Sequence, residues 1–237
     1  MSCYEALAAF YDRLTADVDY GHFADRYERA FSAANGEFHL LLDLCCGTGS
    51  MSLEMSRRGY ELIAVDASEH MLMEAREKCE QLSVPPLFLL QDVSELDLYG
   101  TVDAAFCSLE GINYLSPEQL DTLLQRLRFF IRPGGLFLFD IRSPDYLRNL
   151  DGDTFVDEDE DVFCLWRADF DSELRALVYG MDIFTREGSL WKRSWEEHIE
   201  YAHDVPRLST LLARYGFTDF SVESADERLF VSCRHST

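Results

Sequence analysis

Two glycines and a downstream acid are the residues of this chain whose types and spacing suit ligand binding. Residues 40–50 read LLLDLCCGTGS, so that Gly47 and Gly49 follow an apolar run, and Asp66 lies 19 residues after Gly47. Glycines let the backbone turn tightly and approach a ligand without side chains, and the N–H groups at the start of a following helix face that ligand. An acid at this distance, after a second strand, is placed to accept hydrogen bonds from a ribose.

These residues need a strand, a turn and a helix to position them. The apolar run closed by glycines suits a buried parallel strand, and residues Met51–Arg58 can form a helix stopped by Gly59. A second apolar strand, Glu61–Val65, delivers Asp66 to the same edge. Two short helices at Cys3–Leu14 and His22–Phe31 precede this unit, and their aromatic residues either anchor an N-terminal arm or close over the ligand.

The alternation of strands and helices continues downstream and places more polar residues at strand ends. We expect a helix from Ser68 to about Leu82, strands at Leu87–Leu90 and up to Cys107, a capped amphipathic helix from Ser116 to Phe130, and a strand at Leu136–Ile141. Alternating units of this length imply a parallel sheet with right-handed crossovers, in which ligands bind at the carboxyl ends of the strands.

From Asp151 the pattern changes. Residues 151–161, DGDTFVDEDED, are expected to form a solvated acidic loop. Three alternating segments follow near 162–170, 174–185 and 189–201, with a hairpin turn at 187–189, and predict an antiparallel insert. A helix at Val205–Tyr215 and strands near 217–223 and 228–234 close the chain.

Composition narrows the classes of partner. The 237 residues carry 44 acidic and 21 basic side chains, a formal charge of −23, so nucleic acids and anionic membranes would be repelled. No signal peptide is visible in these residues and no apolar run reaches bilayer length, so we expect a cytoplasmic protein. The seven cysteines lack CxxC spacing and are expected to be reduced thiols, with no metal site.

At this point the sequence resembles the class I S-adenosylmethionine-dependent methyltransferases. The matching motifs are LLDLCCGTGS, VDAS, QDV and IRPGGLFLFDI, which span roughly residues 37–142. One departure is Cys45, which stands where the family commonly has glycine. The segments AAFYDRLTADVDYGHFADRY, CSLEGINYL and SWEEHIEYA also look similar to small bacterial methyltransferases related to sugar-amine N-methyltransferases and glycine N-methyltransferase-like enzymes.

The resemblance implies an α/β fold: a Rossmann-like seven-stranded methyltransferase sheet with helices on both faces, plus a small antiparallel β insert after strand five. It divides the chain into an N-terminal arm or lid (1–35), the core (36–146 and 204–237) and the insert (147–203), which would cap the substrate side. It implies S-adenosylmethionine as cofactor, a small-molecule methyl acceptor with an N or O nucleophile, and a monomer or homodimer.

The resemblance also assigns roles to individual residues. Asp43 and the backbone of residues 45–49 would hold the methionine part of the cofactor. Asp66 would bind both ribose hydroxyls, and residues 92–93 would contact the amino edge of the adenine. The full set implied for the cofactor is Tyr11, Asp43, Cys45, Cys46, Gly47, Thr48, Gly49, Asp66, Ala67, Met71, Gln91, Asp92, Val93 and Cys107. No catalytic base is assigned, because the sulfonium is already a strong electrophile and the protein mainly supplies alignment and water exclusion.

Five residues are candidates for the acceptor side. They are Tyr20, Glu110, Asn113, Tyr114 and His198, and each also has a purely structural interpretation, as a solvated loop acid for Glu110 or a sheet histidine for His198. Two alternative functions remain open. A nicotinamide dehydrogenase shares the glycine turn and acid, but its third glycine would fall at Ser52. A protein that binds the cofactor and transfers nothing is the second.

Overall fold

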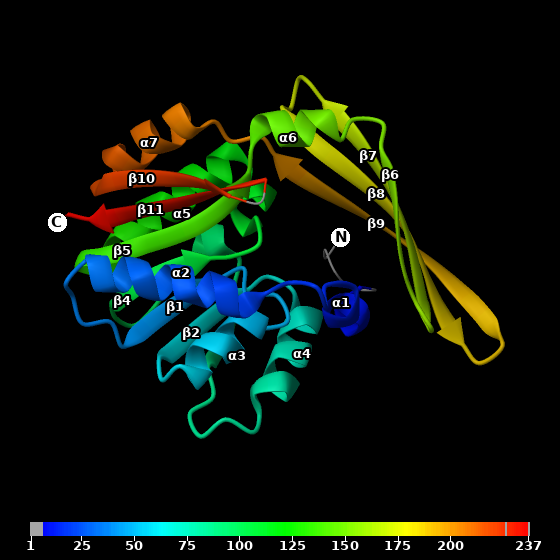
Figure 1. Ribbon diagram of the computed structural model, residues 1–237, viewed down its shortest axis with the longest axis horizontal. Coiled ribbons are helices and arrows are strands. Elements are labelled where there is room, and N and C mark those ends of the chain that lie inside the picture. Colours follow the sequence, from blue (N-terminus) through cyan, green and yellow to red (C-terminus); the bar gives the residue numbers. More distant parts are fainter. Residues whose placement is uncertain (1–6, 226, 237) are drawn as a thin grey trace.

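The computed structural model describes residues 7–225 and 227–236, and a seven-stranded sheet lies at its centre (Figure 1). The strand order is β10-β11-β5-β4-β1-β2-β3, in which β11 runs antiparallel to β5 and β10, while the other neighbours are parallel. The strands are β1 (Leu40–Leu44), β2 (Glu61–Asp66), β3 (Leu87–Leu90), β4 (Val102–Cys107), β5 (Ile131–Arg142), β10 (Phe217–Ala225) and β11 (Arg228–His235).

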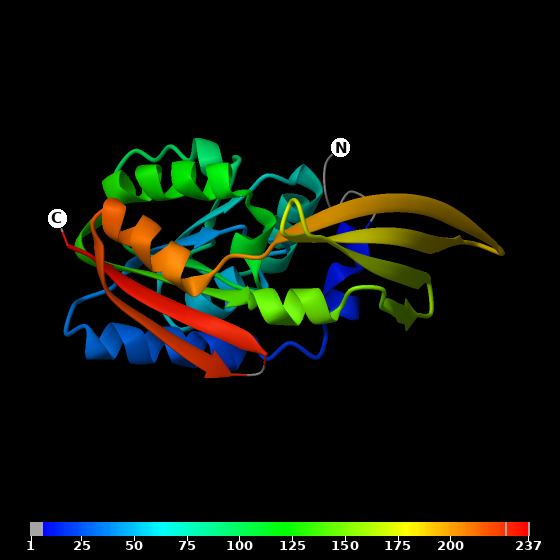
Figure 2. The ribbon, with the colours of Figure 1, turned by 90° about the horizontal axis from the view of Figure 1, so that it is seen from above.

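Helices cover both faces of this sheet, as the view from above shows (Figure 2). They are α1 (Ala8–Leu14), α2 (Tyr20–Ala33), α3 (Ser50–Arg57), α4 (Glu69–Cys79), α5 (Pro117–Phe130), α6 (Pro144–Asn149) and α7 (Val205–Arg214), with short 3-10 turns η1 (Val93–Glu95) and η2 (Gly111–Tyr114). The predicted Rossmann-like seven-stranded fold with helices on both faces is confirmed.

The apolar run at residues 40–44 is buried from both sides, which is why it shows no alternation. Leu41 packs on one face in a cluster with Phe23 and Met55 from α2 and α3. Leu42 packs on the other face in a cluster with Leu123 of α5. The central strand that carries the glycine turn is therefore fixed by two separate cores.

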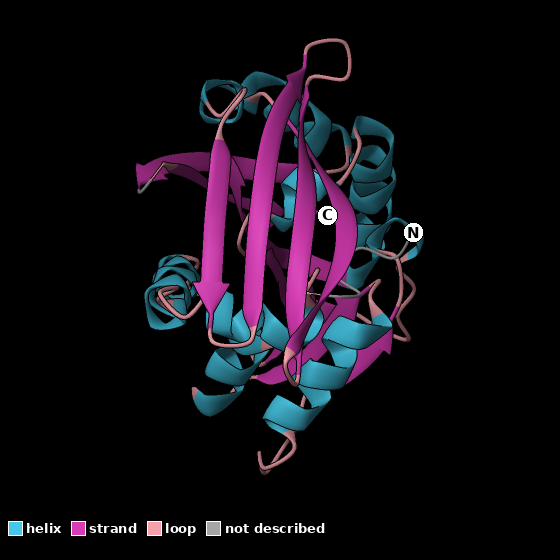
Figure 3. Cartoon of the chain, turned by 90° about the vertical axis from the view of Figure 1, so that its right-hand side faces the viewer, coloured by secondary structure: helices cyan, strands magenta, loops and turns pink. Residues whose placement is uncertain are grey.

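A second, four-stranded antiparallel sheet extends from one side of the molecule, and its strands face the viewer in Figure 3. Its order is β6-β7-β8-β9, with β6 (Thr154–Asp159), β7 (Val162–Asp171), β8 (Ala176–Glu187) and β9 (Leu190–Tyr201). The predicted insert and its hairpin turn at Gly188 are present.

The predicted acidic loop at 151–161 was wrong in its central part. Residues 154–159 form β6, which pairs with β7 as an edge strand. The acidic side chains that suggested a loop suit an edge, because charges there discourage pairing with another chain. Helix α6 was not predicted either, although Ser143 caps it and Pro144 is its first residue.

The two N-terminal helices pack on different sheets. Helix α2 lies on the central sheet, whereas Phe10, Tyr11 and Leu14 of α1 pack against Cys164 and Met181 of the insert. Part of the predicted first helix, from Cys3, lies outside the described residues. Helix α1 thus joins the insert to the core beside the glycine turn. None of the described helices is both long and apolar enough to span a bilayer.

Candidate functional site

A cavity of about 550 Å³ opens where β1, β2 and β4 end, next to β9 of the insert. Its wall brings together most of the residues singled out in the sequence. These are Tyr11, Asp43, Cys45, Cys46, Gly47, Thr48, Asp66, Ala67, Met71, Asp92 and Val93 from the cofactor set, and Tyr20 and Tyr114 from the acceptor set. The size lies within the ~300–1,000 Å³ usual for small-molecule sites.

The glycine turn is held in shape by Asp66. Its Oδ2 accepts a hydrogen bond from the Gly47 N–H at 2.8 Å, and its Oδ1 accepts one from the Ser68 N–H at 2.8 Å. Burial raises the pKa of Asp66, and these backbone donors act in the opposite direction. Each carboxylate oxygen has a second lone pair, so Asp66 retains acceptors for two ligand hydroxyls.

Asp43 is a buried carboxyl at the end of β1. Its Oδ2 accepts a hydrogen bond from the Ser52 hydroxyl at 2.6 Å. Burial raises the pKa of Asp43 to about 7, and the nearby Asp66 acts in the same direction. A buried carboxyl with so few donors is suited to bind a cationic group such as an ammonium, which would restore its charged form.

A polar network at the cavity rim ties α1 to the glycine turn, and sequence reasoning missed it. Asp12 Oδ1 accepts hydrogen bonds from Thr48 at 2.6 Å and Ser50 at 3.3 Å, and its Oδ2 pairs with Lys78 Nζ at 2.5 Å. Lys78 also donates to both hydroxyls. The adjacent Tyr11 is thereby held in the cavity wall. The sequence feature that could have indicated this network is Asp12, the acid next to Tyr11, because a carboxylate beside a cavity residue is available to bond the glycine turn.

Three residues of the cofactor set lie outside the wall. Gly49 is the N-cap residue of α3, with φ +74°, and packs against Ala75 of α4. The Gln91 side chain bonds the backbone of Asp97, and Cys107 is fully buried beneath the turn. These three residues support the cavity from behind.

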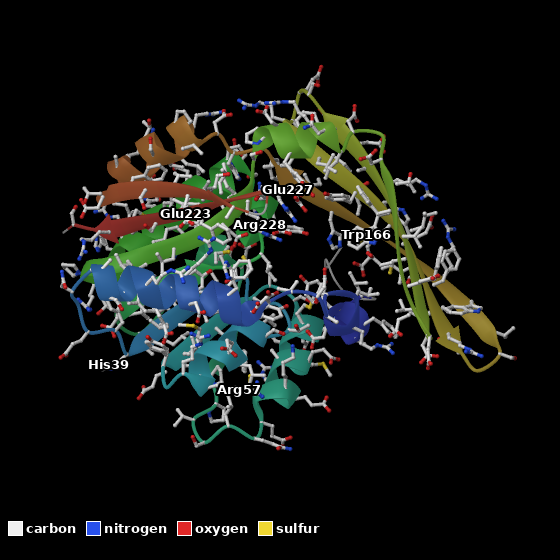
Figure 4. The ribbon with its side chains drawn as sticks, in the orientation of Figure 1. His39, Arg57, Trp166, Glu223, Glu227 and Arg228 are labelled. Carbon is white, nitrogen blue, oxygen red and sulfur yellow. The ribbon has the colours of Figure 1, made fainter. Side chains whose placement is uncertain are left out.

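Three residues of the acceptor set also lie outside the wall. Glu110 pairs with Arg228 at the start of β11, which Figure 4 labels. Asn113 is buried and donates to the Tyr201 carbonyl at 2.9 Å, and His198 is buried at 3.0 Å from Glu196. Their structural interpretation fits their positions. Tyr20 and Tyr114 alone among the acceptor candidates reach the cavity.

The part of the wall next to the insert contains residues that the sequence did not single out. Alternate residues of β9, Glu197, Ile199 and Tyr201, line the cavity. The sequence could have indicated them, because alternate residues of a predicted strand lie on the same face and line the cavity together. The other additions are Ser50, Met51, Ser68, Ser108, Leu109, Gly111, Leu115 and Gln119.

The wall is strongly acidic. Asp43, Asp66, Asp92 and Glu197 line it, and no Lys, Arg or His does so among the described residues. Apolar side chains of Ala67, Met71 and Val93 also line it. The wall therefore offers carboxyl groups for a cation, acceptors for hydroxyls and apolar contacts for a ring.

The fold and this site define a class I S-adenosylmethionine-dependent methyltransferase, and comparison with known proteins shows that the chain belongs to that family. A family model described as a methyltransferase domain matches residues 41–135. The chain is 30% identical to YqeM of Bacillus subtilis (strain 168), whose name carries a provisional methyltransferase assignment, over 98% of this chain and 97% of that protein. These relatives do not support the nicotinamide dehydrogenase or the binding-only alternative.

Solved structures agree. A crystal structure of an S-adenosylmethionine-dependent methyltransferase from Clostridium acetobutylicum ATCC 824 matches with a TM-score of 0.85 and 29% identity, covering 100% of each chain. The sugar N-methyltransferase KedS8 from Streptoalloteichus sp. shares the fold, with a TM-score of 0.80 at 20% identity over 100% of this chain and 97% of that one. S-adenosylmethionine is the cofactor, and the carboxylate acceptors and apolar side chains of the cavity wall are of the kinds that suit its ammonium, ribose and adenine.

Proposed function

We propose that the enzyme transfers the methyl group of S-adenosylmethionine to an amine nitrogen of a small molecule that is cationic when it binds. The observation that carries this proposal is the charge of the cavity wall. It holds four acidic side chains, of which Asp43, Asp66 and Asp92 would face the cofactor and Glu197 of the insert would face the acceptor, and, among the described residues, no Lys, Arg or His. A phosphate or carboxylate acceptor would be repelled there, whereas an ammonium would be attracted.

The acceptor side has the groups that recognise an amine. Glu197 supplies a carboxylate, and Tyr20, Tyr114 and Tyr201 supply ring faces and hydroxyls. Aromatic faces attract cations, and a carboxylate strengthens a hydrogen bond from an ammonium. Each hydroxyl can also accept a hydrogen bond, so the same wall suits a neutral amine after it has lost its proton.

The bound cofactor supplies an electrophilic methyl group on its sulfonium. Asp43 would hold the ammonium of the cofactor and Asp66 its ribose hydroxyls, so that the methyl group faces the acceptor side. Tyr11 and Tyr20 would exclude water from the line of transfer. The acceptor amine must lose a proton before attack, and Glu197, which is exposed, is placed to take it and release it to solvent.

Similar proteins support an amine acceptor. KedS8 is a sugar N-methyltransferase, and CalS10, an amino pentose methyltransferase, shares the fold with a TM-score of 0.76 at 18% identity over 100% of this chain and 98% of that one. We also propose a cytoplasmic location and a monomer or homodimer. The described cysteines are all free, which suits a reducing compartment.

The test is a transfer assay with matched acceptor pools. The full-length enzyme and S-adenosylmethionine would be incubated with primary and secondary amines, their hydroxyl analogues and their carboxylate analogues, and each product measured by mass. We expect methylation in the amine pool only. Products in the carboxylate pool, or equal products in the hydroxyl pool, would overturn the proposal.

Once an amine acceptor is found, Glu197→Gln tests its recognition. We expect kcat/KM for the amine to fall at least tenfold, mainly through KM, while calorimetric affinity for S-adenosylmethionine stays the same. Glu187→Gln, which removes a charge at the far hairpin of the insert, is the matched control and keeps the wild-type value. An unchanged KM in Glu197→Gln would remove this residue from the acceptor site.

A further inference from the structure

We infer that Cys45 and Cys107 form an oxidisable dithiol under the cofactor site, and that their disulfide excludes the cofactor. The inference goes beyond methyl transfer, because it concerns the cofactor half of the cavity and needs no acceptor. It rests on the register of two strands, the space around Gly111 and the unequal access to the two thiols.

Strand register places the two residues within bridging distance. Leu42 lies beside Ala105 and Asp43 beside Phe106 in the parallel β1–β4 pair. Continuing one step puts Cys107 beside Leu44, so Cys45 is one residue further along. With strands about 4.8 Å apart and a rise of about 3.3 Å per residue, the two Cα atoms are separated by about 6 Å. Disulfides span roughly 4.4–6.8 Å between Cα atoms.

The two side chains point into the same small space beside Gly111. A Cβ atom placed on Gly111 would lie 2.6 Å from Cys107 Sγ, 3.1 Å from Cys45 Cβ and 3.7 Å from Cys45 Sγ. The neighbouring Cys45 side chain also contributes to the raised pKa of the Cys107 thiol. The absence of a side chain at Gly111 therefore leaves a space that both cysteine side chains border.

Cys46, the neighbour in sequence, faces the other side of the sheet. It packs with Ala64 and Leu72, whereas Cys107 belongs to the core cluster on the α5 face, against which Cys45 also packs. Cys45 itself adopts a left-handed conformation, with φ +53°, which turns its side chain away from that of Cys46. Among the described cysteines, Cys45 and Cys107 are the two that border the space beside Gly111.

An oxidant reaches Cys45 before Cys107. Cys45 is half-buried and lines the cavity, whereas Cys107 is completely buried and lies outside the wall. The Cys45 side chain and burial raise the pKa of Cys107, which keeps it a thiol at neutral pH. Cys45 is therefore the thiol that is oxidised first, and Cys107 is the thiol that then reacts with it to form the disulfide. This second reaction should become faster as pH rises, because the thiolate is the nucleophile.

Hydrogen peroxide is the oxidant that we name for this step. The Cys45 thiolate attacks one peroxide oxygen, the O–O bond breaks, and Cys45 becomes a sulfenic acid as hydroxide leaves. The Cys107 sulfur then attacks the Cys45 sulfur, an S–S bond forms, and the oxygen departs as water with the proton of Cys107. In total two thiols and one peroxide give one disulfide and two waters.

The disulfide would act on the cofactor site directly. Cys45 lies between Asp43, the carboxyl placed for the cofactor ammonium, and Gly47, the first glycine of the turn. Drawing Cys45 toward Cys107 shifts this segment, and a bound cofactor in turn covers Cys45. Linkage makes the effect reciprocal: the oxidised protein binds cofactor weakly, and the liganded protein resists oxidation.

The test treats the reduced full chain with hydrogen peroxide, with and without saturating S-adenosylhomocysteine. We expect two of the seven thiols to be lost and a Cys45–Cys107 peptide to be found by mass mapping. Calorimetric affinity for S-adenosylhomocysteine should fall at least tenfold and return with dithiothreitol. Saturating S-adenosylhomocysteine should slow formation of the cross-link at least tenfold.

Variants keep the inference open to refutation. Cys45→Gly suits the left-handed backbone and removes the first thiol, and Cys107→Ala removes the second, so neither should form the cross-link. Cys233→Ala, a buried cysteine of β11, is the control and should cross-link as the wild type does. A cross-link through Cys46, equal rates with and without ligand, or full affinity after cross-linking would each overturn the inference.

Discussion

Replacing Asp66 by Asn tests whether one carboxylate both shapes the glycine turn and holds the ribose. In the structure each of its oxygens accepts one backbone N–H, from Gly47 and from Ser68, both at 2.8 Å. Asparagine has one acceptor oxygen, and its amide group donates. Whichever way the amide is turned, it presents a donor to one of the two backbone N–H groups, which loses its partner.

The magnitudes follow from these two bonds. A largely buried donor left without an acceptor costs about 1–3 kcal/mol, so the free energy of unfolding should fall by about that amount. The ribose loses a charged acceptor, and the turn that presents backbone N–H groups is no longer fixed. We therefore expect affinity for S-adenosylmethionine to fall at least tenfold, or about 1.4 kcal/mol.

Urea unfolding measures the first effect and calorimetric titration with S-adenosylmethionine and S-adenosylhomocysteine the second. Glu61→Gln, which neutralises an exposed acid at the other end of β2, is the matched control for loss of charge and should leave both values unchanged. Unchanged affinity in a folded Asp66→Asn protein would refute the placement of the ribose. Unchanged stability would refute the role of Asp66 in the turn.

Two further predictions concern the same turn. Burial raises the pKa of Asp43 to about 7, so the free energy of unfolding without ligand should fall as pH rises from about 4 to 7, while cofactor affinity rises between pH 5.5 and 7.5 because the ammonium selects the carboxylate. Asp43→Asn should flatten the affinity profile and lessen the slope of the stability profile, part of which Asp140 and Glu200 maintain because burial raises the pKa of each to about 7. An affinity profile that keeps its slope, or an unchanged stability profile, would contradict the assignment. Gly49→Ala should cost about 2–5 kcal/mol, because φ is +74° and the new Cβ would lie 2.9 Å from Ala75 Cβ. Gly47→Ala, with φ +53° and open space, should cost only about 1–2 kcal/mol, and equal costs by urea unfolding would show that α4 yields to the contact.

The cofactor half of the site was predictable because its determinants are local in sequence. The strand, the glycine turn and the helix that follow one another from Leu40 to Arg57 are set by burial, by positive φ and by a helix start. Asp66 lies one strand away from Gly47, and parallel pairing brings the two together. The edge strand β6 was not predicted, because its acidic residues are typical of a loop. Its extended conformation depends on pairing with β7, which the composition of the segment does not reveal.

The acceptor half was not predictable to the same extent, because its contacts join distant parts of the chain. Glu110 faces Arg228 of β11 instead of the cavity, and Asp12 finds Thr48 and Lys78. A single sequence gives no register between such segments. A carboxylate such as Glu110 is a residue type that can bind a ligand. Whether it is available to do so depends on its partner in the fold, which for Glu110 is Arg228.

Asn113 shows how a residue that misses the cavity can still decide what lines it. Along β9, Glu197 and Tyr201 line the cavity, while His198 between them is outside the lining and buried, with its ring edge-on to that of Tyr114. A slip of one residue would exchange the two sets. The Asn113 amide bonds the Tyr201 carbonyl at 2.9 Å and the Arg142 N–H at 3.0 Å, so it fixes the end of β9 to β5 of the core. The residues of β9 that line the cavity therefore depend on a buried amide for their register.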